Sequence, residues 1–299
     1  MITLLRRALP VALLSMLAAC NINPPKPVEP PKPLAKPKIA LALGGGAAKG
    51  FAHIGVIKML EANGIVPDII TGTSAGSVVG SLYASGLNGM QLQSKAMQLD
   101  EGELTDWTLS TKGFLKGEKL AAYINNQVGN RPIEKLPRQL GIVATELDSG
   151  QKIVFRVGNT GQAVRASASI PNVFLPVQIG NKRYVDGGLV SPVPVSAARE
   201  MGADFVIAVD ISAKPKPGKA TGLFSMLDQS LNIMSSAALS NELKQADVVI
   251  RPQVLSIGSA DFAARHEAVL EGEKATQQMM AQIRARLQQK ALAMNNPAK

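Results

Sequence analysis

The chain has 299 residues, a net charge of +10 and a hydrophobic content of 46%, which are typical of a packed globular body. Half of this charge precedes residue 39, where six Lys and Arg residues accompany one acidic residue, Glu29, so the rest of the chain is only mildly basic. Because the sequence also lacks an arginine-rich stripe interleaved with aromatic residues, it does not favour nucleic-acid binding.

Residues 1–19 predict a bacterial signal peptide. Arg6 and Arg7 precede an apolar stretch, residues 8–19, which is too short to span a bilayer but has the length of a signal h-region. Cys20 is the only cysteine, which excludes an internal disulfide framework and a multi-cysteine metal site. Leu17-Ala18-Ala19-Cys20 resembles the lipobox of bacterial lipoproteins, so we expect Cys20 to be acylated and to anchor the protein to a membrane. The alternative is an ordinary signal peptide with a free cysteine beside the cleavage site.

Residues 20–37 predict a linker. Seven prolines between residues 21 and 37 disfavour a helix and favour an extended polyproline II spacer, although a disordered tether would have the same composition. Asn21, rather than Asp, follows the cysteine and favours the outer membrane if enteric sorting rules apply. We therefore expect a lipid-anchored protein in the bacterial envelope that faces the periplasm.

Two strand-to-helix units open the folded body, which is expected over residues 38–292 and is followed by a tail at 293–299. In the first unit an apolar run, residues 38–43, leads into a glycine loop at residues 44–50 and then into helical spacing of apolar residues. In the second unit a strand over 67–72 leads into a helix of small residues over 75–84. Two such units in succession predict an α/β fold with a parallel sheet covered by helices.

The rest of the body continues to mix helices and strands. Further helices are expected at residues 90–99, 118–128, 163–171 and 193–201, in a segment that ends at 243, and at 263–292. Strands are expected at 140–145, 152–155, 205–209 and 248–250, with a hairpin of 177–179 and 183–185. A loop rich in Lys, Pro and Gly is expected at 213–222. Phe114 and Leu115 either pack between helices or form the edge of a lid or an acyl-chain entrance.

Ser74 is the candidate nucleophile. It lies between glycines in Gly72-Thr73-Ser74-Ala75-Gly76, where an apolar strand is expected to turn sharply into a helix. Such a turn exposes the serine hydroxyl and holds the residue in a sparsely populated φ/ψ region, and the glycines avoid clashes between strand and helix. Because the pattern also occurs by chance, the residues around it must decide its meaning.

An acyl-transfer site also needs donors for an oxyanion, and the glycine loop can supply them. In an extended glycine run ahead of a helix, the N–H groups of Gly45, Gly46 and Ala47 can point into one cavity. A phosphate-binding interpretation fits less well, because a P-loop needs Ser or Thr after its lysine, where this chain has Gly50, and the dinucleotide pattern needs glycine at Lys49. Lys49 either lies near the oxyanion or a lipid phosphate, or is a solvated surface lysine.

Asp186 is the candidate general base. The chain has two histidines, His53 and His266, and neither follows a late strand, where a Ser-Asp-His order would place its histidine, so both are expected to be packed or surface residues. Asp186 lies between the hairpin and Gly187-Gly188, which let the backbone bend so that the carboxylate can face Ser74. It can accept a proton from a hydroxyl only in a partly dehydrated site. From these residues alone, an aspartate that merely opens a turn would be the preferred interpretation.

Together, blocks of the sequence resemble those of the patatin-like phospholipases. The resemblance covers residues 38 to about 210 and rests on Gly44-Gly45-Gly46-Ala47-Ala48-Lys49-Gly50, Gly72-Thr73-Ser74-Ala75-Gly76, Ala166-Ser167-Ala168-Ser169-Ile170-Pro171 and Asp186-Gly187-Gly188, in that order. One departure concerns the glycine loop: plant patatins have Asp at the position of Gly44 and a third glycine at that of Ala47. This difference bears on the substrate and on the detail of the loop.

The resemblance implies a three-layer α/β/α fold with a mostly parallel central sheet. It also implies a Ser-Asp dyad in which Ser74 attacks a phospholipid or related lipid ester, with Asp186 as base, the glycine loop as oxyanion hole, and no metal or other cofactor. The expected function is thus that of a lipid-anchored serine acyl hydrolase. The alternative is an envelope lipoprotein that binds lipid or protein on the same scaffold without turnover.

Overall fold

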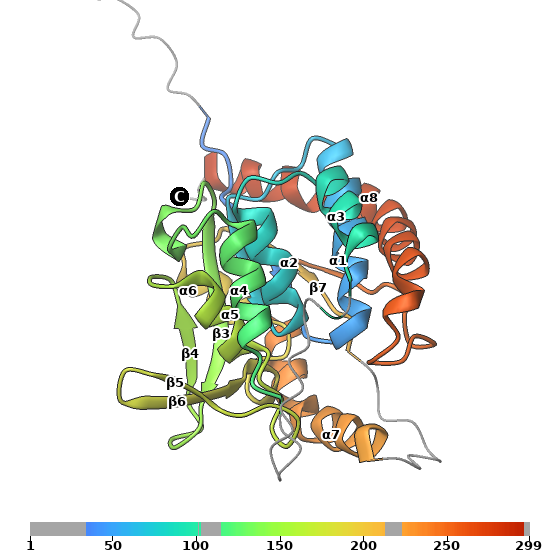
Figure 1. Cartoon of the computed structure of the whole chain (residues 1–299). Helices are drawn as coiled ribbons and strands as arrows, with labels where there is room; N and C mark the ends of the chain where they lie inside the picture. Colours follow the sequence, from blue (N-terminus) through green and yellow to red (C-terminus); the bar gives the residue numbers. More distant parts are fainter. Residues whose placement is uncertain (1–33, 101, 103–114, 213–222, 296–299) are drawn as a thin grey trace, which may run out of the picture. The chain divides into compact units, whose positions relative to one another are not determined.

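The computed structural model describes residues 34–100, 102, 115–212 and 223–295 (Figure 1). The predicted signal peptide, Cys20, most of the proline-rich linker, Phe114 and the predicted loop at 213–222 lie outside these residues. Residues Ala35–Lys299 belong to one compact unit. Within the described part of the chain, no helix combines the length and the apolar character needed to cross a membrane.

The described residues contain strands, α-helices and short 3₁₀ helices. The strands are β1 (Ile39–Leu43), β2 (Ile69–Thr73), β3 (Gln139–Glu146), β4 (Lys152–Phe155), β5 (Val177–Ile179), β6 (Lys182–Asp186), β7 (Phe205–Val209) and β8 (Val248–Ile250). The α-helices are α1 (Ala52–Ala62), α2 (Ala75–Ala84), α3 (Gly89–Gln98), α4 (Glu118–Gln127), α5 (Thr160–Ser167), α6 (Val195–Glu200), α7 (Leu223–Leu243) and α8 (Arg265–Asn295). The 3₁₀ helices are η1 (Ala47–Phe51), η3 (Ile133–Lys135), η4 (Gly187–Leu189) and η5 (Phe262–Ala264).

The described strands form an eight-stranded sheet in the order β5-β6-β3-β2-β1-β7-β8, with β4 paired to β3 outside this path. The five strands β3, β2, β1, β7 and β8 run parallel, as the successive strand-to-helix units predict. Strands β1, β2 and β7 are buried almost throughout, which is why they read as continuous apolar runs in the sequence. Strands β4, β5 and β6 add antiparallel pairs beside β3.

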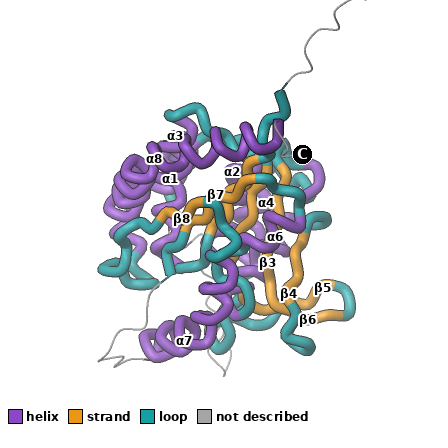
Figure 2. The backbone as a smooth tube through the Cα atoms, turned by 180° about the vertical axis from the view of Figure 1, so that it is seen from behind, coloured by secondary structure: helices purple, strands orange, loops and turns teal. Residues whose placement is uncertain are grey.

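Helices cover both faces of the sheet. On one face, Leu41 and Leu43 of β1 belong to a core that includes residues of α1, α2 and α8. On the other face, Ala40 and Ala42 of the same strand pack with α6 and the C-terminal part of α7. Figure 2 shows these helices from behind, with the outer part of α7 at the same end of the molecule as the β5–β6 hairpin. The structure thus confirms the predicted three-layer α/β/α fold with a mostly parallel sheet.

Two helices differ most from their predicted bounds. The helix predicted over 163–171 is α5, which starts earlier because the Asn159 side chain caps it by accepting a hydrogen bond from the Gln162 N–H. It ends at Ser167 and so is not stopped by Pro171 itself. The last helix, α8, continues past Leu292 to Asn295, whose side-chain amide bonds to both the N–H and the carbonyl of Ala35.

Candidate active site

Ser74 occupies a strained turn between β2 and α2. Its backbone has φ 53° and ψ −122°, a region that residues with a Cβ rarely adopt. A Cβ on Gly72 would lie 2.5 Å from the Gly76 carbonyl oxygen, and a Cβ on Gly76 would lie 2.1 Å from the Leu43 carbonyl oxygen. Strand and helix therefore approach so closely that only glycine fits at both places, as the Gly-x-Ser-x-Gly pattern predicts.

A second serine supports the turn from a distant part of the chain. The N–H of Ser74 donates to Ser167 Oγ at 2.9 Å, and that hydroxyl donates to the Val143 carbonyl oxygen at 2.5 Å. Ser167 thereby links the turn to β3 and α5. In the sequence Ser167 stands out only as part of a motif, because nothing local indicates a bond to a residue 93 positions away.

The strain at Ser74 predicts an unusual order of stability between two variants. Ser74→Gly is expected to be more stable than Ser74→Ala by about 1 kcal/mol, because glycine adopts a positive φ without the clash of a Cβ. Because both variants lack the hydroxyl, the difference in stability between them does not include the effect of losing it. Equilibrium urea unfolding measures the difference, and equal stabilities would show that the turn is not strained.

The register of the sheet places Asp186 beside this turn. Ala144 of β3 pairs with Ile153 of β4 on one edge, so its pairing with Asp186 of β6 must use the other edge. That edge is occupied by β2 one residue earlier, where Val143 pairs with Thr73. Strands β2 and β6 therefore pair with the same side of β3, one after the other. Strand β2 ends there at Thr73, directly before Ser74, and β6 takes over from Ala144. The candidate nucleophile and base are thus brought together by two strands that share one neighbour.

The carboxyl group of Asp186 is buried, with 7% of the residue exposed. Burial raises its pKa from 3.8 to about 6, although the neighbouring Ser74 hydroxyl and the Gly188 N–H favour the ionised form. Oδ1 accepts the Gly188 N–H at 2.7 Å, whereas Oδ2 has no hydrogen-bond partner among the described residues. One oxygen is therefore fixed by the backbone and the other is free to accept a proton.

The glycine loop lies next to the turn, and a Cβ on Gly45 would meet the Cβ of Ser74 at 3.2 Å. The Gly45 N–H donates to the Pro192 carbonyl oxygen at 3.0 Å, so in this conformation it is not free for an oxyanion, contrary to the expectation for this residue. Among the described residues, no backbone acceptor bonds the N–H of Gly46 or of Ala47. Ala47 has φ 49°, a positive value that is uncommon for alanine. Gly46 and Ala47 thus remain as candidate donors.

Lys49 is 4% exposed and lies in η1, two residues after Ala47. Its backbone N–H donates to the Gly46 carbonyl oxygen at 3.2 Å. The solvated surface lysine considered above is therefore wrong, and Lys49 is part of the packed loop.

Close packing also explains the other glycines of the motifs. A Cβ on Gly50 would lie 2.7 Å from the Ala75 Cβ, and one on Gly187 would lie 2.3 Å from the Val143 carbonyl oxygen. Gly44 donates its N–H to the Val209 carbonyl oxygen at 3.1 Å, which joins the loop to β7. Gly188 supplies the N–H that fixes Asp186. Each of these glycines thus allows either a close approach or a backbone hydrogen bond around the candidate site.

Neither histidine is placed as a base. His53 is fully buried, its Nε2 lies 2.8 Å from the Gly44 carbonyl oxygen, and burial lowers its pKa to about 4. The ring is therefore neutral at pH 7 and donates its Nε2–H to the glycine loop, which confirms the expected packed histidine. His266 is exposed on α8.

In the part of the chain that the structure describes, no group of three or more His, Cys, Asp or Glu side chains could hold a metal ion.

His53→Ala is expected to affect stability more than turnover. Removing the buried ring leaves a cavity and an unpaired Gly44 carbonyl, which lowers the free energy of unfolding by about 2–4 kcal/mol. The folded fraction should retain most of its activity, measured as ester hydrolysis well below the midpoint of thermal unfolding. The control is His266→Ala, which should change neither quantity. If folded His53→Ala lost as much activity as Ser74→Ala, the assignment of Ser74 and Asp186 as a dyad would fail.

The chain matches known proteins over the region that holds these residues. The family model described as patatin-like phospholipase matches residues 41–199, which include the glycine loop, Ser74 and Asp186. An uncharacterized NTE family protein of Mycobacterium bovis is 37% identical over 177 residues, covering 58% of this chain and 49% of that protein. Another, of Mycobacterium tuberculosis, is 29% identical over 264 residues, covering 79% and 45%. The chain thus spans about half the length of these relatives.

Two further proteins, one compared by sequence and one by structure, are also similar to the chain. A lysophospholipase of Meyerozyma guilliermondii is 30% identical over 181 residues, covering 58% of this chain and 13% of that protein. The crystal structure of VipD from Legionella pneumophila has a TM-score of 0.53 and 15% sequence identity, covering 83% of this chain and 67% of VipD. At that identity, the likeness to VipD shows the fold alone.

Proposed function

Because the chain belongs to the patatin-like phospholipase family, we propose that it is a serine acyl hydrolase that cleaves lipid esters with Ser74 and Asp186 as its catalytic dyad. One observation carries the proposal: a serine held at φ 53° lies beside a buried carboxyl group with one free oxygen. Ser74 is itself 8% exposed at the strained turn, and burial adapts the carboxyl group to proton transfer near neutral pH.

In the first half of the reaction, Ser74 Oγ attacks the ester carbonyl carbon while Asp186 Oδ2 takes the hydroxyl proton. The developing oxyanion accepts hydrogen bonds from the N–H groups of Gly46 and Ala47, and each such donor is worth about 10²-fold or more in rate. The tetrahedral intermediate then collapses, the carbon–oxygen bond to the alcohol breaks, and Asp186 returns the proton to the leaving alcohol. An acyl group remains bonded to Ser74.

In the second half, water attacks the acyl group as Asp186 takes one of its protons. The fatty acid leaves, and the proton passes from Asp186 to Ser74 Oγ. No histidine is needed, because the same carboxylate serves as base and then as acid in both halves. Its pKa of about 6 leaves it ionised at pH 7 but basic enough to accept a proton.

The proposed substrate is a phospholipid or related lipid ester in the bacterial envelope. The family and a named lysophospholipase among the relatives support the substrate class. The lipobox-like sequence at Cys20 supports a lipid anchor, the body after residue 38 is mildly basic, and Asn21 supports the outer membrane. An anchored hydrolase would meet its substrate in the membrane that holds it.

Cys20→Ser is expected to shift the protein from the membrane fraction to the soluble fraction of the cell, because a serine cannot carry the thioether-linked lipid. Radioactive palmitate fed to growing cells should label the wild type and leave the variant unlabelled. Separation of inner and outer membranes by density tests the proposed location. Retention of the unlabelled variant in washed membranes would contradict an acyl anchor.

A fluorophosphonate probe tests the catalytic proposal against the non-catalytic alternative, a lipoprotein that binds lipid or protein on this scaffold. An activated serine should be labelled once per chain, with the adduct on the peptide that contains Ser74 and none on Ser74→Ala. Heat-denatured protein is the control for chemical reactivity without an active site. Folded wild type that remains unlabelled would favour the binding protein.

A further inference from the structure

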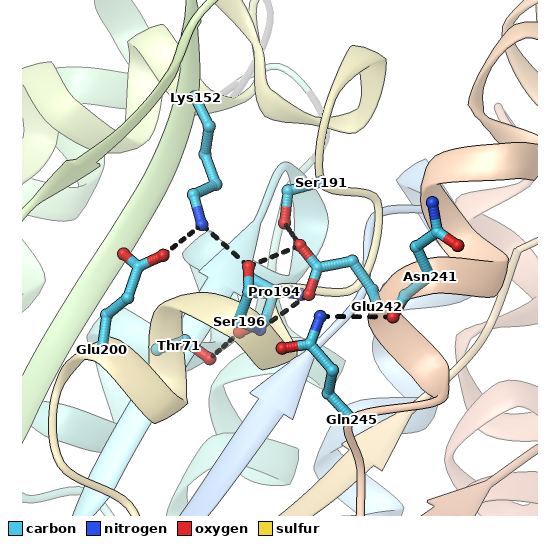
Figure 3. Close-up of polar contacts among 9 residues, drawn as sticks. All are labelled: Thr71, Lys152, Ser191, Pro194, Ser196, Glu200, Asn241, Glu242 and Gln245. Atoms are coloured by element: carbon cyan, nitrogen blue, oxygen red, sulfur yellow. Dashed lines mark hydrogen bonds and ion pairs between the residues drawn. The ribbon is translucent and has the colours of Figure 1, made fainter.

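A buried glutamate outside the candidate site holds part of it in place. Glu242, on the last turn of α7, is 6% exposed, and its Oε1 accepts from Ser191 Oγ at 2.5 Å and from Ser196 Oγ at 2.8 Å. Its Oε2 accepts the Ser196 N–H at 2.6 Å. Figure 3 shows Glu242 between the two serines. A buried carboxylate is costly unless it is hydrogen-bonded, and three such bonds satisfy this one.

The serines belong to a segment, residues 187–196, that links Asp186 to α6. Its backbone carbonyls accept hydrogen bonds from the parts of the site around Ser74. The Ser191 carbonyl accepts Thr73 Oγ1 at 2.8 Å, directly before the candidate nucleophile. The Pro192 carbonyl accepts the Gly45 N–H at 3.0 Å, directly before the candidate oxyanion donors. This segment, which we call the bracing segment, thus joins the base, the nucleophile turn and the glycine loop.

We propose that Glu242 is a positioning residue for the acyl transfer, because its three hydrogen bonds to Ser191 and Ser196 fix the bracing segment. Among the described residues, no hydrogen bond or ion pair joins Glu242 to Ser74 or Asp186. Glu242 acts through Ser191 and Ser196, which hold the segment whose Ser191 and Pro192 carbonyls accept hydrogen bonds from Thr73 and Gly45. The inference rests on the function proposed above and adds α7 to the elements on which that function depends.

The chemistry of the contacts favours a carboxylate at residue 242. Ser196 Oγ accepts from Lys152 Nζ at 2.7 Å, so its own proton is directed at Glu242, and Lys152 also pairs with Glu200 at 2.7 Å (Figure 3). All three groups that face Glu242 therefore donate. Glutamine would place an NH₂ group against one of these donors, so it could satisfy at most part of the set.

Kinetics of Glu242→Ala and Glu242→Gln test the proposal, with Gln245→Ala as the matched control. Gln245 lies in the turn that directly follows α7, and among the described residues its side chain bonds only to the carbonyl of Asn241 in that helix. We expect kcat to fall about 10- to 100-fold in Glu242→Ala, less in Glu242→Gln and not in Gln245→Ala, with KM changed by less than about twofold. A loss confined to kcat distinguishes misplaced catalytic groups from weaker substrate binding.

Hydrogen exchange of the backbone amides provides a second readout that does not need activity. In folded Glu242→Ala, peptides covering residues 44–47 and 187–196 should exchange faster than in wild type, while α8 should be unchanged. If wild type is active but both Glu242 variants match Gln245→Ala in kcat and exchange, the positioning role is overturned and the proposed function stands. If wild type hydrolyses no ester, the proposed function fails, and the exchange data still decide whether Glu242 fixes the segment.

Discussion

Ser74→Ala is expected to abolish the release of fatty acid from lipid esters, with a fall in kcat of about 10⁴-fold or more. The variant removes the oxygen that forms the acyl-enzyme, so the remaining oxyanion donors have no nucleophile to assist. Alanine keeps the Cβ and the positive φ of the turn, so the site around it should be unchanged. Measurement of fatty acid released from phospholipid vesicles gives the result, and far-UV circular dichroism verifies the fold.

The matched control for Ser74→Ala is Ser77→Ala, one helical turn further along. Ser77 is also buried and also carries a hydroxyl, which donates to the Ser74 carbonyl oxygen at 2.7 Å. It should lose far less activity, because that hydroxyl does not face the proposed site of attack. Equal losses in the two variants would mean that damage to the turn, rather than loss of the nucleophile, explains the effect.

Asp186→Asn should abolish hydrolysis as well, by about 10³- to 10⁴-fold, because an amide cannot take the Ser74 proton. Asparagine retains an oxygen for the Gly188 N–H, so the turn after β6 should be kept.

In wild type, kcat/KM should fall tenfold per pH unit well below pH 6, since the base must be ionised. An acid limb near pH 4, or none, would contradict Asp186 as the base.

Asp186→Asn should also stabilise the fold at high pH. The pKa of Asp186 is raised from 3.8 to about 6, so the native state favours the protonated form. The stability that this group contributes is fully present below pH 3.8 and is lost as pH rises through about 6, by about 3 kcal/mol for a shift of this size. Asparagine cannot ionise, so Asp186→Asn should gain up to about 3 kcal/mol over wild type at pH 8 and much less at pH 4.5.

Urea unfolding at these two pH values measures that difference in stability. Asp148→Asn is a useful control, because Asp148 is an exposed surface aspartate that pairs with Arg183. This pair lowers the pKa of Asp148, so its variant should gain nothing at pH 8. A variant Asp186→Asn that is less stable than wild type at pH 8 would show that the buried carboxylate is stabilised by contacts beyond those described.

Local sequence signals were enough to predict the strands, most helices and the strained turn at Ser74. The glycines at 72 and 76 indicated the turn because close backbone approach leaves a direct trace in the sequence. The same holds for the buried apolar runs of β1, β2 and β7, which indicated a parallel sheet. These features depend on residues within one or two elements of each other.

Features that depend on long-range register have no local signal in the sequence, and the pairing of Ser74 with Asp186 was implied by the resemblance to the patatin-like phospholipases. The proximity of Asp186 to Ser74 follows from the shared edge of β3, and no spacing in the sequence encodes that pairing. The hydrogen bond from Gly45 to Pro192 joins residues far apart in the chain, which is why all of residues 45–47 were expected to be free donors. Glu242 gave no signal for the same reason, since a glutamate at the end of a helix is ordinarily a solvated residue.

The most direct test of the account is a lipidomic comparison of envelope membranes incubated with wild type and with Ser74→Ala. Wild type should release fatty acid and the matching lyso or deacylated lipid in equal amounts, and Ser74→Ala should release neither. The lipid that disappears would also identify the head group and the acyl position that are cleaved. Equal lipid profiles after incubation with the two proteins, both folded and both bound to the membranes, would contradict the proposal that Ser74 cleaves lipid esters.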